Sequence, residues 1–159
     1  GIDEGDLIKY KQPAAKMLFG VTSNLNYKAF DLSFTLRANT GNYVYNNNAS
    51  NGAHFNRLSE LVTQNILTSV LESNFTRPQY FSSYYIEDAS FIKMDNITLG
   101  YTLDKLINKS GIKARVYGTV QNAFVLTMYS GIDPEVNGGI DNNIYPRSRT
   151  FIVGVNVGF

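Results

Sequence analysis

The chain has 159 residues, a formal net charge of +1, and neither cysteine nor tryptophan. The near-neutral charge gives no basis for binding nucleic acid, and the absence of cysteine excludes a disulfide framework and a thiolate metal site. No apolar run reaches the roughly 18 residues of a transmembrane helix, whereas 11 Tyr and 10 Phe residues, with abundant Asn and Gly, are typical of strands and loops.

The first two predicted strands lie at residues 17–27 and 30–39, where apolar and polar residues alternate. A two-residue loop at 28–29 would pair Tyr27 with Phe30. This register also sets apolar against apolar and polar against polar side chains along both strands, so the two segments are predicted to form a hairpin. The further predicted pairs are Leu25 with Leu32, Val21 with Leu36, Asn24 with Ser33 and Thr22 with Thr35.

A long connection at residues 40–94 follows the hairpin. Its residues 56–72 carry apolar side chains near helical spacing, which predicts a helix that ends before Pro78. The single histidine, His54, has no cysteine or acidic cluster near it, so we expect a solvated loop residue and neither a metal ligand nor a catalytic base. The apolar residues of the predicted helix are Leu58, Leu61, Val62, Ile66, Leu67, Val70 and Leu71.

Three more alternating segments follow, at about residues 95–103, 114–124 and 150–159. The middle segment is the least regular, because Asn122 falls on the parity of the apolar residues. In the last segment Ile152 is the one apolar residue on the polar parity. The sequence therefore predicts five antiparallel strands and an all-β fold.

The five segments have the features of membrane-spanning strands. They are about ten residues long, near the nine to eleven that cross a tilted bilayer, their apolar faces lack charge, and their polar faces suit a wet lumen. The connections at 28–29 and 104–113 are short beside those at 40–94 and 125–148. We therefore predict a segment of an antiparallel transmembrane β-barrel with a periplasmic C-terminus and long extracellular loops, one of which contains the helix.

Chain direction places Phe159 at the periplasmic interface of the membrane, where one of the aromatic girdles of such a barrel lies. Five strands cannot close a barrel, because two open edges would leave on the order of ten backbone groups unpaired in hydrocarbon. The remaining strands are expected to precede Gly1 in a longer polypeptide. The alternative is a soluble β-sandwich that binds carbohydrate, in which the sides bearing Phe34 and Val153 would be buried against a second sheet.

Four stretches carry a family resemblance: NLNYKAFDLSFTLRANTGNYVYN (24–46), SSYYIEDASFIKMDNITLGYTL (82–103), RVYGTVQNAFVLTMYSGIDPEV (115–136) and NNIYPRSRTFIVGVNVGF (142–159). Together they cover most of the chain and closely resemble the C-terminal end of SusC/RagA-type TonB-dependent transporters. The resemblance implies a barrel of about 22 strands, in the outer membrane of a Bacteroidota bacterium. It also implies an N-terminal plug domain and a SusD-like lipoprotein cap.

Such pairs import oligosaccharides or peptides, with energy supplied by TonB through the plug. Residues 1–159 would then be the C-terminal part of the barrel, serving as wall and outer loops, with the plug domain, TonB box and earlier strands outside them. The apolar side of the predicted loop helix is expected to pack on the barrel, with contact to the SusD-like cap as the alternative. A passive porin is a further alternative, which an upstream plug and TonB box would exclude.

No Ser/His/Asp set, phosphate-binding glycine loop or zinc spacing occurs in the sequence, so we expect no enzyme activity and no cofactor. Residues 133–138 begin like a calcium loop, but Ile144 stands where a bidentate Glu belongs, and a tight loop built on Gly138-Gly139 and 141–143 is favoured. Rings in outer loops could stack on sugars or on peptide side chains. The candidate ligand or partner contacts are Tyr80, Tyr84, Tyr85, Tyr129 and Tyr145.

Overall fold

The computed structural model of the chain describes residues 5, 8–59, 65–103, 113–142 and 145–158. These residues form two compact units, which are described separately. The sheet unit comprises Met17–Thr40, Phe91–Thr127 and Arg147–Phe159, and the loop unit comprises Gly1–Lys16, Gly41–Ser90 and Met128–Pro146. No helix in the described ranges is long and apolar enough to cross a membrane.

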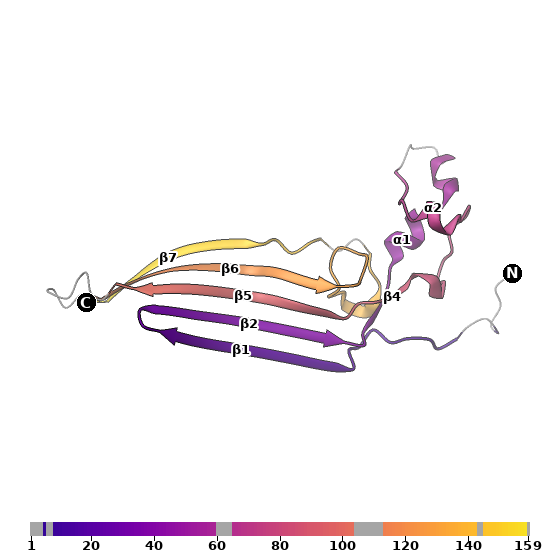
Figure 1. Cartoon of the computed structure of the whole chain (residues 1–159). Coiled ribbons are helices and arrows are strands. Elements are labelled where there is room, and N and C mark those ends of the chain that lie inside the picture. Colours follow the sequence, from indigo (N-terminus) through magenta and orange to yellow (C-terminus); the bar gives the residue numbers. More distant parts are fainter. Residues whose placement is uncertain (1–4, 6–7, 60–64, 104–112, 143–144, 159) are drawn as a thin grey trace. The chain divides into compact units, whose positions relative to one another are not determined.

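The sheet unit is one antiparallel sheet with the strand order β1-β2-β5-β6-β7 (Figure 1). Each strand pairs with the next one along the chain inside this unit, and each predicted strand is present. The observed bounds extend the third predicted strand toward its N-terminus and the fourth at both ends. The strands are β1 (Met17–Tyr27), β2 (Phe30–Thr40), β5 (Phe91–Thr102), β6 (Lys113–Thr127) and β7 (Thr150–Gly158).

The hairpin of β1 and β2 has the predicted register, with Tyr27 opposite Phe30 and every further predicted pair in place. Its connection is a two-residue turn at Lys28 and Ala29. Lys28 has a φ of 56°, a left-handed conformation that Gly or Asn adopts at lower cost. The pairing of the two faces, rather than favourable turn chemistry, therefore sets the register of this hairpin.

A β-bulge at Asp95 explains why the alternation of β5 breaks at this point. The neighbouring residues Met94 and Asn96 pair with adjacent residues of β2, so Asp95 is an extra residue in the ladder. An extra residue shifts the alternation by one position. Met94 and Ile97 consequently share the apolar face although three positions separate them, and the strand begins at Phe91 instead of the predicted residue 95.

The irregular residue of β6 also lies at a break in pairing. The β5–β6 ladder continues from Gln121 to Phe124 across a register shift, and Asn122 lies within this gap with a φ of 50°. Its side-chain amide donates to the carbonyl oxygen of Ser148 at 3.0 Å. Asn122 is therefore polar at an apolar parity because the strand is locally irregular there.

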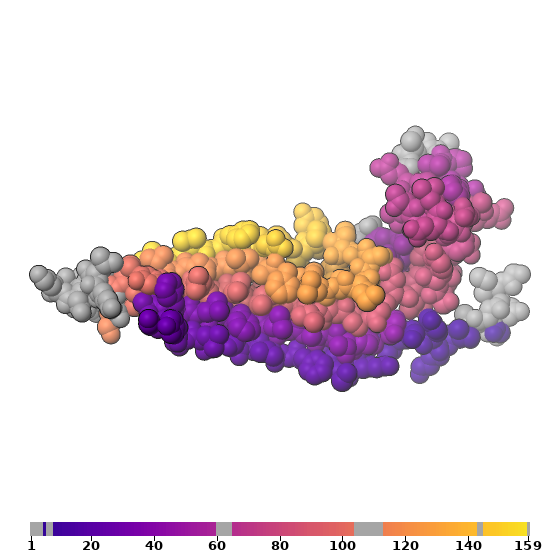
Figure 2. All heavy atoms as spheres, in the orientation of Figure 1, coloured from indigo at the N-terminus to yellow at the C-terminus, as the bar shows by residue number. Residues whose placement is uncertain are grey.

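The apolar face of the sheet is not covered by a second layer within the sheet unit. The exposed fractions of Val153 and Val155 on β7 are 81% and 60%, and that of Phe19 on β1 is 54%. In Figure 2, atoms of all five long strands reach the surface that faces the viewer. The described sheet unit therefore lacks the second sheet that the β-sandwich alternative requires.

The loop unit contains a small two-stranded sheet and several short helices (Figure 1). Its core consists of two clusters, one around Val44, Ala89 and Tyr129 and one around Ala53, Val70 and Tyr85. Its elements are β3 (Tyr43–Tyr45), α1 (Asn47–Gly52), η2 (Phe55–Ser59), α2 (Val70–Ser73), η3 (Ser83–Tyr85), β4 (Ile86–Asp88) and η4 (Asn137–Gly139).

The prediction of one helix over residues 56–72 is wrong. The described part of this range contains the 3-10 helix η2, an irregular stretch at residues 65–67 and the start of the one-turn helix α2. The backbone N–H of Leu67 donates to the carbonyl oxygen of Gly52 at 3.3 Å, a bond to a distant segment that a continuous helix would not permit. Two apolar residues of this range, Ile66 and Val70, pack in a tertiary cluster near Ala53, whereas Leu58 and Leu71 are exposed.

Candidate functional site

A charged pair on the polar face of the sheet spans three strands. Arg115 of β6 donates from Nε to Oδ1 of Asp31 on β2 at 2.8 Å, and its Nη2 donates to the other carboxylate oxygen. The strand β5 runs between β2 and β6, and Gly100 lies beneath the pair. A Cβ atom at Gly100 would lie 2.3 Å from Oδ1 of Asp31, so the glycine makes room for this bidentate contact.

Tyr117 extends the pair toward β7. The guanidinium carbon of Arg115 lies 5.0 Å from the centroid of the Tyr117 ring, a cation–π distance. The ring in turn lies over Gly154 of β7, where a Cβ atom would be 2.5 Å from Cζ of Tyr117. Gly100 on β5 and Gly154 on β7, the two strands that flank β6, thus accommodate a continuous polar and aromatic strip across the face.

A second charged pair depends on the bulge. Arg37 of β2 donates from Nη2 to Oδ1 of Asp95 at 2.8 Å, and its Nε contacts the other oxygen of the same carboxylate. Lys93, opposite Arg37 in the register, is 4% exposed and bears a second positive charge on this face. The bulged Asp95 therefore supplies a negative charge beside two cations, which stabilises their close approach.

The segments of the loop unit are joined by polar contacts that range from exposed to buried. The carboxylate of Glu87 accepts from the backbone N–H and the hydroxyl of Ser130, both at 2.8 Å, and from the Asn46 amide at 2.9 Å. The Tyr129 hydroxyl donates to Oδ2 of Asp141 at 2.7 Å. Burial raises the pKa of Tyr129 well above its ordinary value, and the hydrogen bond to Asp141 adds to the rise. The contacts of Glu87 with Ser130 join residues 41–90 to residues 128–142, and the Tyr129–Asp141 bond links the two ends of the latter segment.

The five predicted contact tyrosines divide into exposed and buried residues. Tyr80, Tyr84 and Tyr145 are 57%, 56% and 89% exposed, which leaves their rings available to a ligand or partner. Tyr85 and Tyr129 are 4% and 5% exposed and belong to the two core clusters. Burial raises the pKa of Tyr85, and the neighbouring phenols add to the rise. These two rings pack the loop unit and present no free face. The remaining predicted residue, Phe159, lies outside the described residues.

The expectation that His54 is solvated is wrong. Its exposed fraction is 4%, because it lies between α1 and η2 beside Ala53, which is itself buried.

Among the described residues, no three His, Asp or Glu side chains are grouped to hold a metal ion. In the segment that resembles a calcium loop, Oδ1 of Asp133 accepts from the N–H of Glu135 at 2.9 Å, as in an Asx turn.

Sequence reasoning missed both charged pairs. It placed Phe81 among the outer-loop aromatic residues, and the structure shows that this side chain is 86% exposed. Phe81 has a φ of 55°, an unfavourable conformation for a bulky residue. A signal for the charged pairs existed, because Asp31, Arg37 and Arg115 all fall on the polar parity of their strands. The pattern did not indicate which of these charges would meet.

Comparison with known sequences finds relatives among TonB-dependent receptors. The TonB-dependent receptor SusC of Bacteroides thetaiotaomicron is 43% identical over 166 residues, which cover 99% of this chain and 16% of that protein. The TonB-dependent receptor P3 of Formosa agariphila is 29% identical over 168 residues, which cover 92% of this chain and 17% of that protein. The chain thus spans about a sixth of the length of these relatives. No family model matches it.

Solved structures give the same result for the fold. The chain superposes on the RagAB peptide importer in its closed-closed state with a TM-score of 0.80 and 25% identity, over 97% of this chain and 18% of that one. The open-open state gives a TM-score of 0.75 at 23% identity, a likeness of fold. The sequence identity with SusC and the superposition on RagAB together identify the chain as a C-terminal barrel segment of the SusC/RagA type of TonB-dependent receptor.

Proposed function

We propose that the chain forms part of the wall and outer loops of a TonB-dependent importer in the bacterial outer membrane, which takes up oligosaccharides or peptides. One observation carries the proposal: the five long strands have an uncovered apolar face and a polar face whose carboxylates Asp31 and Asp95 are paired with arginines. Such a sheet is stable with lipid on one side and water on the other. The 43% identity with SusC supports the same function.

The direction of the strands follows from the lengths of their connections. The turn at Lys28-Ala29 is short, whereas the connections from β2 to β5 and from β6 to β7 form much of the loop unit. Outer-membrane barrels have short periplasmic turns and long extracellular loops. The loop unit is therefore extracellular in this proposal, and β7 ends on the periplasmic side.

The two outer strands of the sheet require neighbours in a membrane. β1 pairs only with β2, and β7 pairs only with β6, among the strands that the structure describes. Each unpaired backbone group in hydrocarbon costs several kcal/mol. The neighbours are the remaining strands of the same barrel, which also encloses a plug domain that TonB engages.

Contacts with a SusD-like surface lipoprotein and with substrate are assigned to the exposed aromatic residues of the loop unit. Two contacts with Tyr45 fix the position of Phe81. The backbone N–H of Phe81 donates to the Tyr45 hydroxyl at 2.8 Å, and the two rings stack with their centroids 6.0 Å apart. A strained, exposed aromatic residue of this kind is often part of a binding surface. The further contact residues are Tyr80, Tyr84 and Tyr145.

Uptake by the intact polypeptide that contains this chain tests the import function. Cells expressing it with its lipoprotein partner are given panels of fluorescent oligosaccharides and peptides, with and without a functional TonB. We expect uptake of at least one class, and we expect that uptake to stop without TonB. Uptake that continues without TonB would favour a passive porin, and a protein that fractionates as soluble without detergent would contradict the barrel assignment.

Photo-cross-linking tests the partner surface. A photoreactive phenylalanine analogue at Phe81 should cross-link to the lipoprotein, whereas the same analogue at Tyr27, beside the short turn, should not. Tyr27 is a matched control because its ring is also exposed, at 70%. Equal cross-linking at both positions, or none at Phe81, would remove the assigned contact.

A further inference from the structure

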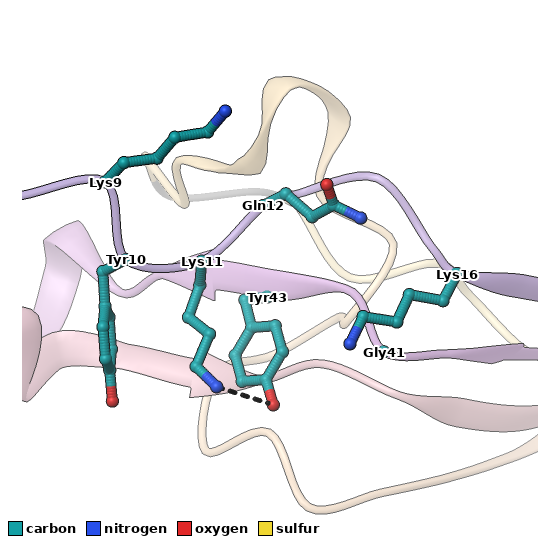
Figure 3. A pocket seen from close by; sticks show the side chains of 7 residues that line it. All are labelled: Lys9, Tyr10, Lys11, Gln12, Lys16, Gly41 and Tyr43. Carbon is teal, nitrogen blue, oxygen red and sulfur yellow. Dashed lines mark hydrogen bonds between the residues drawn. The ribbon is translucent and has the colours of Figure 1, made fainter.

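The loop unit contains a groove lined by lysines that neither the charged pairs nor the proposed aromatic surface uses. It has a volume of about 370 Å³ and is lined by Lys9, Tyr10, Lys11, Gln12, Lys16, Gly41 and Tyr43 (Figure 3). Three of these seven residues carry a positive charge, and none carries a negative charge. The groove is therefore a site of positive potential that is open to solvent.

Two of the lysines are positioned by specific contacts. The ammonium of Lys11 lies 4.5 Å from the centroid of the Tyr43 ring and donates to the Tyr43 hydroxyl at 3.5 Å. The stem of Lys16 lies against Gly41, where a Cβ atom would be 2.9 Å from Cδ of the lysine. In the view of Figure 3, Lys11 and Lys16 lie on either side of the Tyr43 ring. A glycine and an aromatic ring thus shape the groove around these two cations.

Among the described residues, no carboxylate neutralises the positive charge of the groove. The carboxylates Asp31 and Asp95 pair with arginines of the sheet unit, and the ammonium groups of Lys9, Lys11 and Lys16 have no carboxylate partner in the described ranges. Clustered ammonium groups attract ligands that carry several negative charges. Phosphate groups suit such a site, because each one combines a high negative charge with three oxygens that accept hydrogen bonds.

We propose that this groove binds the phosphate groups of a phosphorylated saccharide. Lys11 and Lys16 would contact the phosphate oxygens directly, Lys9 would add charge at the rim, and Tyr10 and Tyr43 would lie against the sugar. The same chemistry is found in a phosphorylated glycolipid of the outer leaflet and in a free sugar phosphate. Lys16 directly precedes β1 and Gly41 directly follows β2. This chain position favours a ligand at the membrane interface if the strands cross the membrane as proposed.

Binding to the intact protein in detergent tests the site with two probes, diphosphoryl lipid A and soluble glucose 1,6-bisphosphate. The variant Lys9→Gln/Lys11→Gln/Lys16→Gln should weaken binding of the lipid by roughly tenfold or more at low salt. The control variant Lys28→Gln, which removes an exposed lysine at the short turn, should bind as the wild type does. Salt should weaken wild-type binding, because the contacts are between exposed charges.

The two probes separate the sources of the phosphate. Competition by the soluble bisphosphate would indicate that the phosphate groups suffice, and lysine-dependent binding of the lipid alone would indicate a glycolipid site. Failure of both probes to bind, or an equal loss in Lys28→Gln, would overturn the proposal. Import activity is measured separately, so loss of this site and failure of the proposed function are distinguishable.

Discussion

At the scale of single residues, the glycine at position 100 determines whether a charged pair can form over a β-strand. Asp31 and Arg115 lie on strands that do not pair with each other, and the side chains meet above Gly100. A side chain at this position would occupy the same space as the carboxylate. Close approach of side chains, rather than a turn or a left-handed backbone, is the reason for glycine here.

The substitution Gly100→Ala should therefore destabilise the folded protein, because the new methyl group displaces Asp31 from Arg115. We expect a lower unfolding temperature, by on the order of one to a few degrees, measured on the intact protein in detergent by heat-dependent mobility on gels. Gly118→Ala is the matched control, since its Cβ would meet nothing within 4 Å. An equal effect of the two substitutions would contradict the role of Gly100.

The phenol of Tyr129 should make the loop unit sensitive to alkaline pH. Its pKa in the folded protein is raised above the ordinary 10.0, so the unfolded segment loses this proton first as the pH rises. The stabilisation is complete below about pH 10 and declines above it. Protease cleavage within residues 128–142 of the intact protein should accordingly accelerate above this pH.

The variant Tyr129→Phe should lose most of this alkaline response. At neutral pH it should be less stable by roughly 1 kcal/mol, because the hydrogen bond to Asp141 is absent. The control is Tyr84→Phe, which removes the hydroxyl of an exposed residue. This change should alter the cleavage rate neither at neutral nor at alkaline pH. A Tyr129→Phe variant with the wild-type pH profile would refute this explanation.

At the scale of the element, the bulge of β5 keeps one apolar face continuous through a break in the sequence pattern. Ile92 and Met94 pair with residues on the apolar side of β2, as does Ile97 beyond the bulge. Without the extra residue, the part of β5 before the bulge would present its apolar side chains to the polar face. Lys93 lies on the polar face in the native structure. Without the bulge, its side chain would point toward lipid instead.

Deletion of Asp95 should therefore prevent correct barrel assembly. We expect loss of the folded, heat-modifiable form from the outer-membrane fraction, because a one-residue slip reverses both faces over residues 91–94. The substitution Asp95→Asn is the control: it keeps the bulge, removes the ion pair with Arg37, and should still assemble with reduced stability. If the deletion variant assembled as well as Asp95→Asn, the bulge would not be what keeps the faces continuous.

At the scale of the whole molecule, the assignment of the two faces of the sheet to lipid and water makes a direct prediction. An arginine in place of Val153, on the apolar face of β7, should destabilise the barrel by about 2–4 kcal/mol near the bilayer midplane. An arginine in place of Asn156, on the opposite face of the same strand, should cost much less. Unfolding titrations of the intact protein in lipid vesicles compare the two variants. A larger cost at Asn156 would reverse the assignment of faces.

The strands and faces were predictable because their signal is local. Alternation with period two is a property of consecutive side chains, and it predicted β1 and β2 with the observed register. The resemblance in four stretches added the barrel family, which the identity with SusC supports. The same local reasoning failed at residues 56–72, where Ile66 and Val70 pack in a cluster with residues of α1 and η3 and the described residues do not form one helix.

The charged pairs and the state of the loop residues were decided by tertiary structure. Arg37 and Asp95 are 58 residues apart in sequence, and Asp31 and Arg115 are 84 apart, so each contact depends on which strands become neighbours. The burial of His54, Tyr85 and Tyr129 likewise depends on segments that meet only after folding. The sequence alone determined the strands, their parity and the hairpin, because these depend on neighbouring residues. Strand order and loop packing determined which polar groups pair and which aromatic rings remain free to bind.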